Sequence, residues 1–176
     1  MKAMTTSRCV AMVGTTALAF ATACFSPSVA AAAPDDEAAI RALEDRFAAA
    51  FNAGDVNAIM KSYVPDQSLV VFDVVPPRQY VGADAYRKDW VDLFAMLKGP
   101  PKFDITDLAI TVEGNLGFSH SIQHVSGTGT KGQPIDLTVR VTDGYRKIGG
   151  EWLIVLEHVS VPVDLATGKP DFSSKP

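Results

Sequence analysis

The sequence predicts an α+β domain in which three N-terminal helices pack on a strongly curved, mainly antiparallel sheet and leave a cone with a pocket. Apolar residues first recur at three- and four-residue steps, which is the period of helices. From Lys102 onward the period changes to two, which is the period of strands. Helices followed by a long meander of strands indicate that the helices share one face of the sheet. The hollow between the two layers is where we expect a ligand.

Three helices are expected in the first part of the domain. The first, from about 37 to 53, has one apolar face formed by Ile40, Leu43, Phe47 and Phe51. Asp55 caps a short second helix, which Pro65 ends. A third helix begins after Gly82 and ends before Gly99. Its apolar stripe consists of Tyr86, Trp90, Leu93, Phe94 and Leu97.

The strands are predicted from alternating apolar residues and turn signals. They are expected at 69–75, with a short extension at Tyr80 and Val81, and at about 103–112, 116–126, 134–147 and 151–161. Pro76 ends the first of them, because proline cannot donate to a strand ladder. The chain has no internal repeat, so a single domain is predicted over residues 37–162.

The segments outside this domain have their own interpretations. Residues 1–30 are predicted to be a signal peptide, because two basic residues precede an apolar stretch and small residues at 28 and 30 suit a signal peptidase. The stretch falls short of the roughly 20 apolar residues that a membrane span needs. Residues 31–36 are expected to be a flexible lead and residues 163–176 a C-terminal tail. We therefore expect an exported protein, periplasmic or secreted, without a membrane span.

Composition excludes several classes of function. Both cysteines, Cys9 and Cys24, lie within residues 1–30, so the mature domain has no disulfide and no cysteine-bound metal. A lipid anchor at Cys24 is the alternative to simple cleavage, although Ala21 stands where a lipoprotein signal prefers leucine. Removing residues 1–30 lowers the number of basic residues from 16 to 14 against 20 acidic ones, a formal charge of −6. Nucleic acid is therefore not an expected partner.

Three segments carry a resemblance to a known family. They are residues 47–55 (FAAAFNAGD), 146–154 (RKIGGEWLI) and 158–162 (HVSVP). Together they resemble the SnoaL-like branch of the nuclear transport factor 2-like superfamily, which has a cystatin-like fold. The superfamily includes ketosteroid isomerases, polyketide cyclases, scytalone dehydratase, limonene epoxide hydrolase and the association domain of calcium/calmodulin-dependent kinase. The resemblance implies the cone fold and a homodimer, but no single activity, because these proteins share a cavity and differ in its lining.

Ketosteroid isomerase offers a comparison of individual residues. That enzyme uses an aspartate base and an oxyanion hole built from a tyrosine and a protonated aspartate. The resemblance aligns the tyrosine with Phe47, which has no hydroxyl, and the base with Val71. Asp73 lies two residues further along the same strand, and Asp143 matches the second oxyanion donor. One role is thus kept in place, one is displaced and one is absent.

Two interpretations of Asp73 stay open. Its strand is otherwise apolar, so an ionised carboxylate there needs a partner or a wet cavity. In a pocket its pKa would rise toward the range useful for a general base. At the strand end it would instead be solvated or cap a turn beside Pro76.

The final hairpin is predicted to turn at residues 148 and 149. This register sets Asp143 opposite Ile154, Tyr145 opposite Trp152 and Val139 opposite His158, all on the concave face. Asp143 then either enters the pocket or, after a slip of one residue, satisfies turn amides at the surface. His158 either donates to a ligand carbonyl or is a core histidine bonded to a backbone carbonyl. The other expected pocket residues are Tyr63, Trp90, His120, Val139, Val141 and Trp152.

A second pairing, around the loop at 127–132, predicts the position of His120. His120 is expected opposite Val139, in line with His158 across one intervening strand, which suits opposite ends of a bound molecule better than a shared metal. No metal and no cofactor are therefore predicted. On the convex face Glu157 is expected opposite Arg140 as an ion pair. The convex face is also expected to carry three valines, which would lie at a dimer interface: Val155, Val159 and Val161.

Three functions are compatible with this pattern. The first is a cofactor-independent isomerase, cyclase or dehydratase acting on a small apolar carbonyl compound. Asp73 would take a proton from carbon, and Asp143 or His158 would steady the resulting enolate. The second is a non-catalytic module that binds a small apolar or aromatic molecule. The third is a structural domain whose role is dimerisation.

Overall fold

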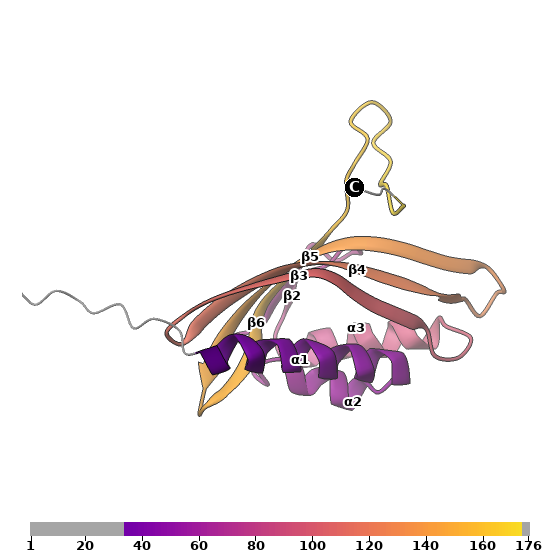
Figure 1. Cartoon of the computed structure of the whole chain (residues 1–176). Coiled ribbons are helices and arrows are strands. Elements are labelled where there is room, and N and C mark those ends of the chain that lie inside the picture. The colour runs from indigo at the N-terminus through magenta and orange to yellow at the C-terminus, as the bar shows by residue number, and fades with distance from the viewer. Residues whose placement is uncertain (1–33, 174–176) are drawn as a thin grey trace, which may run out of the picture.

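The computed structural model describes residues 34–173, and a layer of helices lies against one face of a curved six-stranded sheet (Figure 1). The helical elements are α1 (Pro34–Ala53), α2 (Val56–Ile59), the 3-10 turn η1 (Met60–Ser62) and α3 (Ala83–Ala95). The strands are β1 (Val70–Phe72), β2 (Tyr80–Val81), β3 (Lys102–Glu113), β4 (Leu116–Thr128), β5 (Pro134–Ile148) and β6 (Glu151–Ser160). This is the predicted α+β cone. The predicted signal peptide, with Cys24, lies outside the described residues.

The first helix begins three residues earlier than predicted, at Pro34, where the fixed φ of proline suits a first helical position. It ends at Gly54, whose φ of +67° favours glycine. Asp55 then caps α2 as predicted, and its carboxylate accepts from the Ala58 amide at 3.0 Å. The apolar face of α1 points at the sheet, so this helix closes one side of the interior.

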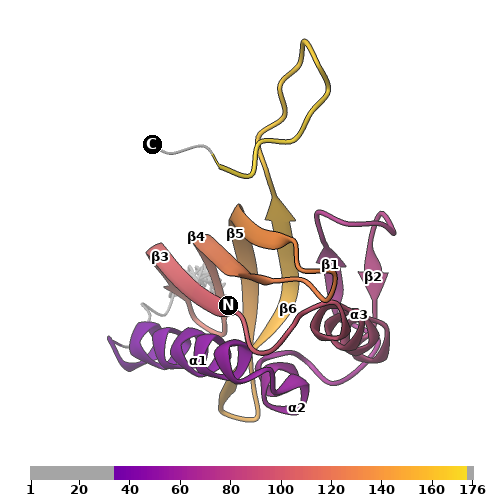
Figure 2. The same ribbon diagram turned by 90° about the vertical axis from the view of Figure 1, so that its right-hand side faces the viewer.

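The sheet has the strand order β2-β1-β6-β5-β4-β3, which Figure 2 shows edge to edge. Strands β3 to β6 form an antiparallel meander, whereas β1 runs parallel to β6. The sheet is therefore mixed, with the N-terminal strands added beside the last strand of the chain. Two irregularities interrupt the ladders, one in β3 between Thr106 and Ala109 and one opposite Gly144 and Tyr145. Bulges of this kind bend a strand and increase its twist.

Aromatic side chains fill much of the space between helices and sheet. Phe51 stacks on Phe103 with ring centroids 4.3 Å apart, and Phe47 meets both of them edge to face. Trp90 of α3 contacts the same group at 5.3 Å from Phe51. Burial of each such ring stabilises the fold by about 2–3 kcal/mol. The region where α1, α3 and β3 meet is thus a packed aromatic core.

The segment after β6 has more structure than the predicted tail. Asp171 donates its amide to the Pro162 carbonyl at 2.9 Å, and Thr138 of β5 donates to the Phe172 carbonyl at 2.8 Å. Between these ties the chain makes a turn that projects from the sheet on the side opposite the helices (Figure 1). Among residues 34–173, no helix combines the length and the apolar character required of a transmembrane helix.

Candidate functional site

The pairing of β5 with β6 differs from the predicted register. Tyr145 lies opposite Ile154, but Gly144 lies opposite Leu156, so Val155 is an extra residue in β6. Beyond this bulge Asp143 lies opposite Glu157, and Thr142 lies opposite His158. The hairpin turns at Gly149 and Gly150, one residue later than predicted, so Trp152 lies opposite Lys147 and not opposite Tyr145. This shift of two positions leaves the faces unchanged, but the predicted register also lacked the bulge. A single added residue moves every later side chain of a strand to the other face.

The bulge corrects two predictions about faces. Asp143 is buried in the interior with an exposed fraction of 2%, as alternation on β5 predicts. His158, expected beside it, is exposed on the outer face of the sheet, where its ring contacts Phe72. Glu157, expected to pair with Arg140 outside, is instead buried with an exposed fraction of 5%. The interior therefore receives a second carboxyl group in place of an imidazole.

His120 also lies on the outer face, so its expected position in the pocket is wrong. It is exposed and lies opposite Thr142, which in turn lies opposite His158. The two histidines are in line across one intervening strand, as predicted, but they flank Thr142 instead of Val139. His124 lies elsewhere, with Nε2 at 2.7 Å from Asp136 Oδ1.

Glu157 is held by two tyrosine hydroxyls inside the domain. Tyr63, which follows η1, donates to Oε2 at 2.6 Å, and Tyr86 of α3 donates to Oε1. Both tyrosines are about 1% exposed. Burial raises the pKa of Glu157 to about 7, although the two hydroxyl donors favour its ionised form. Tyr63, expected at the pocket mouth, is therefore a fixed partner of this carboxyl group.

A third buried acid comes from α1. Glu44 accepts from the Tyr145 hydroxyl at 2.7 Å, and the Ser119 hydroxyl lies 2.8 Å from the same tyrosine oxygen. Because a tyrosine has one hydroxyl proton, Ser119 donates to Tyr145 while Tyr145 donates to Glu44. Burial raises the pKa of Glu44, against the lowering effect of this hydrogen bond.

Asp143 lies opposite Glu157 and near enough to Glu44 to feel its charge, and one of its carboxyl oxygens is unsatisfied. Its Oδ1 has no hydrogen-bond partner in the described part of the protein. Burial raises its pKa well above the usual range, and the charges of Glu157 and Glu44 raise it further. Burial and the neighbouring charges thus favour the protonated form of Asp143, against the lowering effect of a hydrogen bond from Tyr145.

Asp73 lies just beyond the end of β1 and is half-buried. Its carboxylate accepts from the amide of Val74, which matches the turn-capping interpretation of the sequence. Burial nevertheless raises its pKa, and the nearby charge of Asp89 raises it further. The charge of Asp73 also raises the pKa of Glu157. Asp73 is thus at the edge of the same group of acids.

The other expected pocket residues divide into two groups. Val139 and Val141 are buried on the same inner face of β5 as Asp143. Trp90 is also buried, and its Nε1 lacks a partner among the described residues, as does Ser121 Oγ of β4. Three buried polar groups, from α3, β4 and β5, therefore lack a partner within residues 34–173, which is uncommon for buried polar atoms.

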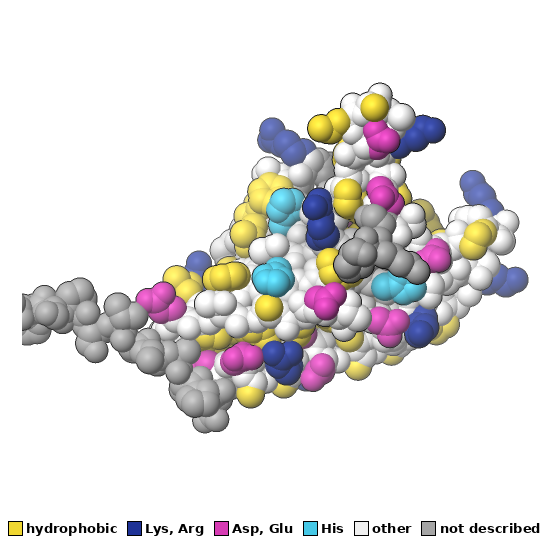
Figure 3. Space-filling view, turned by 45° about the horizontal axis from the view of Figure 1, so that its top comes forward, with side chains coloured by type: hydrophobic (Ala, Val, Ile, Leu, Met, Phe, Trp, Pro, Cys, Tyr) yellow, Lys and Arg dark blue, Asp and Glu magenta, His cyan; other side chains and the backbone are white. Residues whose placement is uncertain are grey.

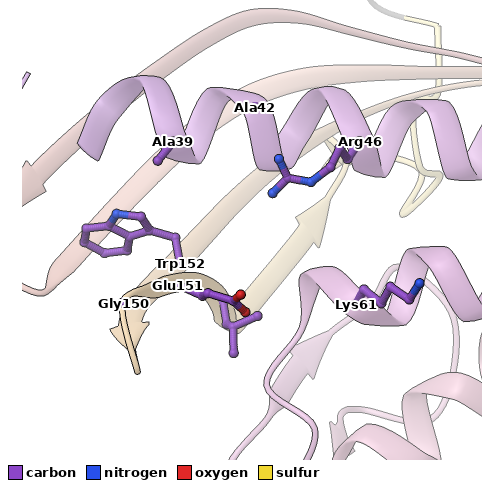
Figure 4. Close-up of a pocket in the computed structure, with 8 residues that line it drawn as sticks. Ala39, Ala42, Arg46, Lys61, Gly150, Glu151 and Trp152 are labelled. Atoms are coloured by element: carbon purple, nitrogen blue, oxygen red, sulfur yellow. The ribbon is translucent and has the colours of Figure 1, made fainter. Parts of the chain in front are cut away.

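Trp152 belongs to a different place. Its Nε1 donates to Asp36 at 3.0 Å, and Lys147 donates to the same carboxylate at 2.6 Å. These contacts fasten the first turn of α1 to the β5–β6 hairpin. Figure 4 shows Trp152 beside a hollow of about 460 Å³ between α1 and β6, which Arg46 and Lys61 also line. Trp152 thus lines a surface hollow instead of the space around Asp143.

Sequence reasoning missed Glu44, Glu157, Tyr86 and Tyr145 as site residues. A signal for Glu44 was present, because it lies four residues after Ile40 and three before Phe47, on the apolar stripe of the helix. Nothing in the sequence marks Val155 as a bulge, so Glu157 could not be found this way. Among the described residues no cluster of three or more His, Cys, Asp or Glu could hold a metal ion.

The helices on a bent mixed sheet, with acids inside, define a nuclear transport factor 2-like protein. A protein of this class from Pseudomonas putida KT2440, of unknown function, is 30% identical, with a TM-score of 0.74, 82% of this chain covered and 99% of that chain. The family model for the SnoaL-like domain matches residues 40–164, and this chain belongs to that family. No curated protein matches the sequence.

More distant structures share the fold alone. A ketosteroid isomerase-like protein from Erwinia carotovora atroseptica is 20% identical, with a TM-score of 0.62, covering 72% of this chain and 96% of that chain. A protein of unknown function with a cystatin-like fold from Nostoc punctiforme PCC 73102 is 16% identical, with a TM-score of 0.63, covering 75% of this chain and 95% of that chain. These likenesses confirm the predicted fold class.

Proposed function

We propose that this protein is a cofactor-independent enzyme of the isomerase, cyclase or dehydratase kind that moves a proton on a small apolar carbonyl compound. The observation that carries the proposal is the buried pair Asp143 and Glu157, which lie opposite each other on neighbouring strands. Two carboxyl groups so placed in a dry interior do not ionise together, so one keeps a proton that the other lacks. Such a pair keeps a neutral carboxylic acid, Asp143, as a hydrogen-bond donor, and the nearby Asp73 supplies the base.

The proposed roles follow from the surroundings of each acid. Asp143, neutral and with a free Oδ1, donates a hydrogen bond to the carbonyl oxygen of the substrate. Asp73, whose pKa is raised by burial, takes the proton from the neighbouring carbon and returns it at another position. The carbonyl oxygen gains negative charge while the proton is on Asp73 and loses it on return. No other reactant is consumed.

The tyrosines explain why the donor role falls on Asp143. Ketosteroid isomerases use a tyrosine and an aspartic acid together, but Phe47 supplies no hydroxyl here. The hydroxyls of Tyr63, Tyr86 and Tyr145 are all directed to Glu157 or Glu44. Asp143 keeps an Oδ1 without a partner among the described residues, and we assign this oxygen to the ligand.

Proton exchange tests this proposal without knowledge of the product. The mature protein is incubated in D2O with a panel of cyclic and aryl ketones, and loss of the α-proton signals is followed by NMR. We expect faster exchange for at least one ketone, and a loss of about 10²-fold or more in Asp73→Asn. Asp45→Asn, an exposed change on α1, is the matched control. Exchange at the buffer rate for the whole panel, or full activity in Asp73→Asn, contradicts the assignment.

A non-catalytic binding module is the second candidate, and the packing favours it at one point. Both oxygens of Glu157 are occupied by tyrosine hydroxyls, and the residues around them are largely apolar or aromatic. Such a lining suits an apolar or aromatic molecule but leaves few groups free to react. Thermal-shift measurements with the same ketones separate the two functions: stabilisation without proton exchange indicates binding alone.

We also propose a homodimer formed through the apolar half of the outer sheet face. Phe118 and Leu156 lie on either side of Gly144 there, and both are exposed together with Phe72 and Leu116. These residues replace the interface expected from the valines of β6, since the bulge turns Val159 to the inner side. Light scattering should give twice the monomer mass, and Phe118→Asp should reduce the measured mass to that of the monomer. Leu165→Asp, on the projecting turn, is the control.

Export is proposed on the sequence alone. The protein recovered by osmotic shock from an expressing cell should begin near residue 31. A lipid-modified chain beginning at Cys24 would support the anchored form instead. A chain retaining residues 1–30 in the cytoplasm would contradict both.

A further inference from the structure

The outer face of the sheet has a hollow that the proposed activity does not use. It has a volume of about 450 Å³, and its outward-facing lining includes His120, Arg140, Thr142, His158 and Ser160. These residues belong to the three central strands β4, β5 and β6. Figure 3 looks onto this face and shows histidine and basic side chains gathered over the strands.

The strand register arranges three of these side chains around a small residue. His120 and His158 lie opposite Thr142 on its two sides, and neighbouring strands are about 4.8 Å apart. The two imidazoles therefore start from positions roughly 10 Å apart. Arg140 lies two residues from Thr142 on the same face of β5. Thr142 is the shortest of the four side chains, so its hydroxyl forms the floor between the longer groups.

The charges around this floor are unusual for so acidic a protein. Among the described residues, His120, Arg140 and His158 take part in no ion pair. His124, by contrast, lies against Asp136. Asp107 is the acidic residue of the lining, and it sits at the irregularity of β3 with a φ of +52°. A guanidinium and two imidazoles that line one hollow are groups that bind small anions.

We propose that this hollow binds a small anionic group, a carboxylate or a phosphate, seated over Thr142. Arg140 supplies the permanent charge and its forked N–H donors. His120 and His158 each donate an N–H from the sides, and the hydroxyls of Thr142 and Ser160 complete the set of donors. Asp107 at the edge favours an anion that carries a hydroxyl or amino group at its other end. The site is separate from the interior acids, which lie on the opposite face of the same strands.

The chain contains three histidines, so NMR of their ring carbons can test the site directly. Inorganic phosphate, acetate and L-malate are titrated separately at pH 6.5, with chloride holding the ionic strength constant. We expect saturable shifts of the His120 and His158 signals, with little change at His124. Saturation by phosphate but not by the two carboxylates identifies phosphate chemistry, and the reverse identifies carboxylate chemistry.

Variants separate a site from general attraction of ions. Arg140→Gln should weaken binding by about tenfold or more, because the guanidinium carries the permanent charge. His124→Gln removes an exposed histidine and should leave the titration unchanged. Equal, non-saturating shifts at all three histidines, or unchanged binding in Arg140→Gln, would overturn the proposal. The titration is repeated in Phe118→Asp, so that loss of the proposed dimer is not mistaken for loss of the anion site.

Discussion

The two faces of the sheet carry different chemistry, although alternate residues of the same strands build both. On the inner face Asp143 and Glu157 are buried among tyrosines and have raised pKa values. On the outer face Thr142, which precedes Asp143, and His158, which follows Glu157, are exposed. The extra residue Val155 decides which of Glu157 and His158 lies inside. Neighbouring residues in one strand can therefore contribute very differently to the free energy of unfolding.

The largest difference is expected between Glu157→Ala and His158→Ala. The first leaves a cavity and deprives Tyr63 and Tyr86 of their acceptor. We expect it to lower the free energy of unfolding by about 3 kcal/mol at pH 5. The second removes an exposed side chain and should change it by less than about 0.5 kcal/mol. Urea unfolding of both variants measures the contrast, and equal losses would contradict the assigned faces.

The inner acids should also make stability depend on pH. A carboxyl group whose folded pKa is raised contributes stability that is present below its unfolded pKa and is lost as pH rises through its folded pKa. For Glu157 that window runs from 4.5 to about 7. The free energy of unfolding should fall by about 2 kcal/mol across it, and Glu157→Gln should flatten the decline.

Asp36 and Asp66, whose pKa values are lowered by hydrogen bonds, act in the opposite direction at lower pH. Urea midpoints at pH 5 and pH 8 give the measurement, and a rise in stability over this range would argue against protonated inner acids.

A smaller effect is expected from single hydroxyls. Tyr86→Phe removes one of the two donors to Glu157 and should lower the free energy of unfolding by about 1–2 kcal/mol at pH 7. Tyr80→Phe, which removes a less buried hydroxyl bonded to Asp89 at 2.6 Å, is the matched comparison and should lose under about 1 kcal/mol. Thermal unfolding at constant pH ranks the two, and the reverse order would mean that Glu157 does not depend on its tyrosines.

The smallest effect is expected on the outer face. His124 and Asp136 form an exposed contact at 2.7 Å. Exposed ion pairs contribute about 0–1 kcal/mol, so Asp136→Asn should leave the urea midpoint nearly unchanged at pH 6. A loss comparable with that of Glu157→Ala would show that the outer face also carries part of the stability.

The sequence predicted the elements well and the site only in part. Strands β3 to β6 lie within two residues of their expected ends, because alternating residues and glycine turns mark them locally. The inward position of Asp143 followed from alternation within β5 alone. The partner of Asp143 depended on the register between two strands, and the bulge at Val155 leaves no mark in local composition. Tyr86 and Tyr145 look like ordinary core residues in sequence. Their hydroxyls meet Glu157 and Glu44 only through tertiary contacts between residues far apart in the chain.

The parallel pairing of β1 with β6 has a consequence for how the chain reaches its fold. Val70 finds its strand partner at Leu156, and Tyr63 bridges to Ile154, so the first half of the chain is completed by its last strand. Contacts between distant residues slow folding, since the intervening loop must close first. A growing chain that has emerged only as far as β5 can pair β1 with β2 but not with β6. The complete sheet can therefore form only after the last strand, β6, has been synthesised.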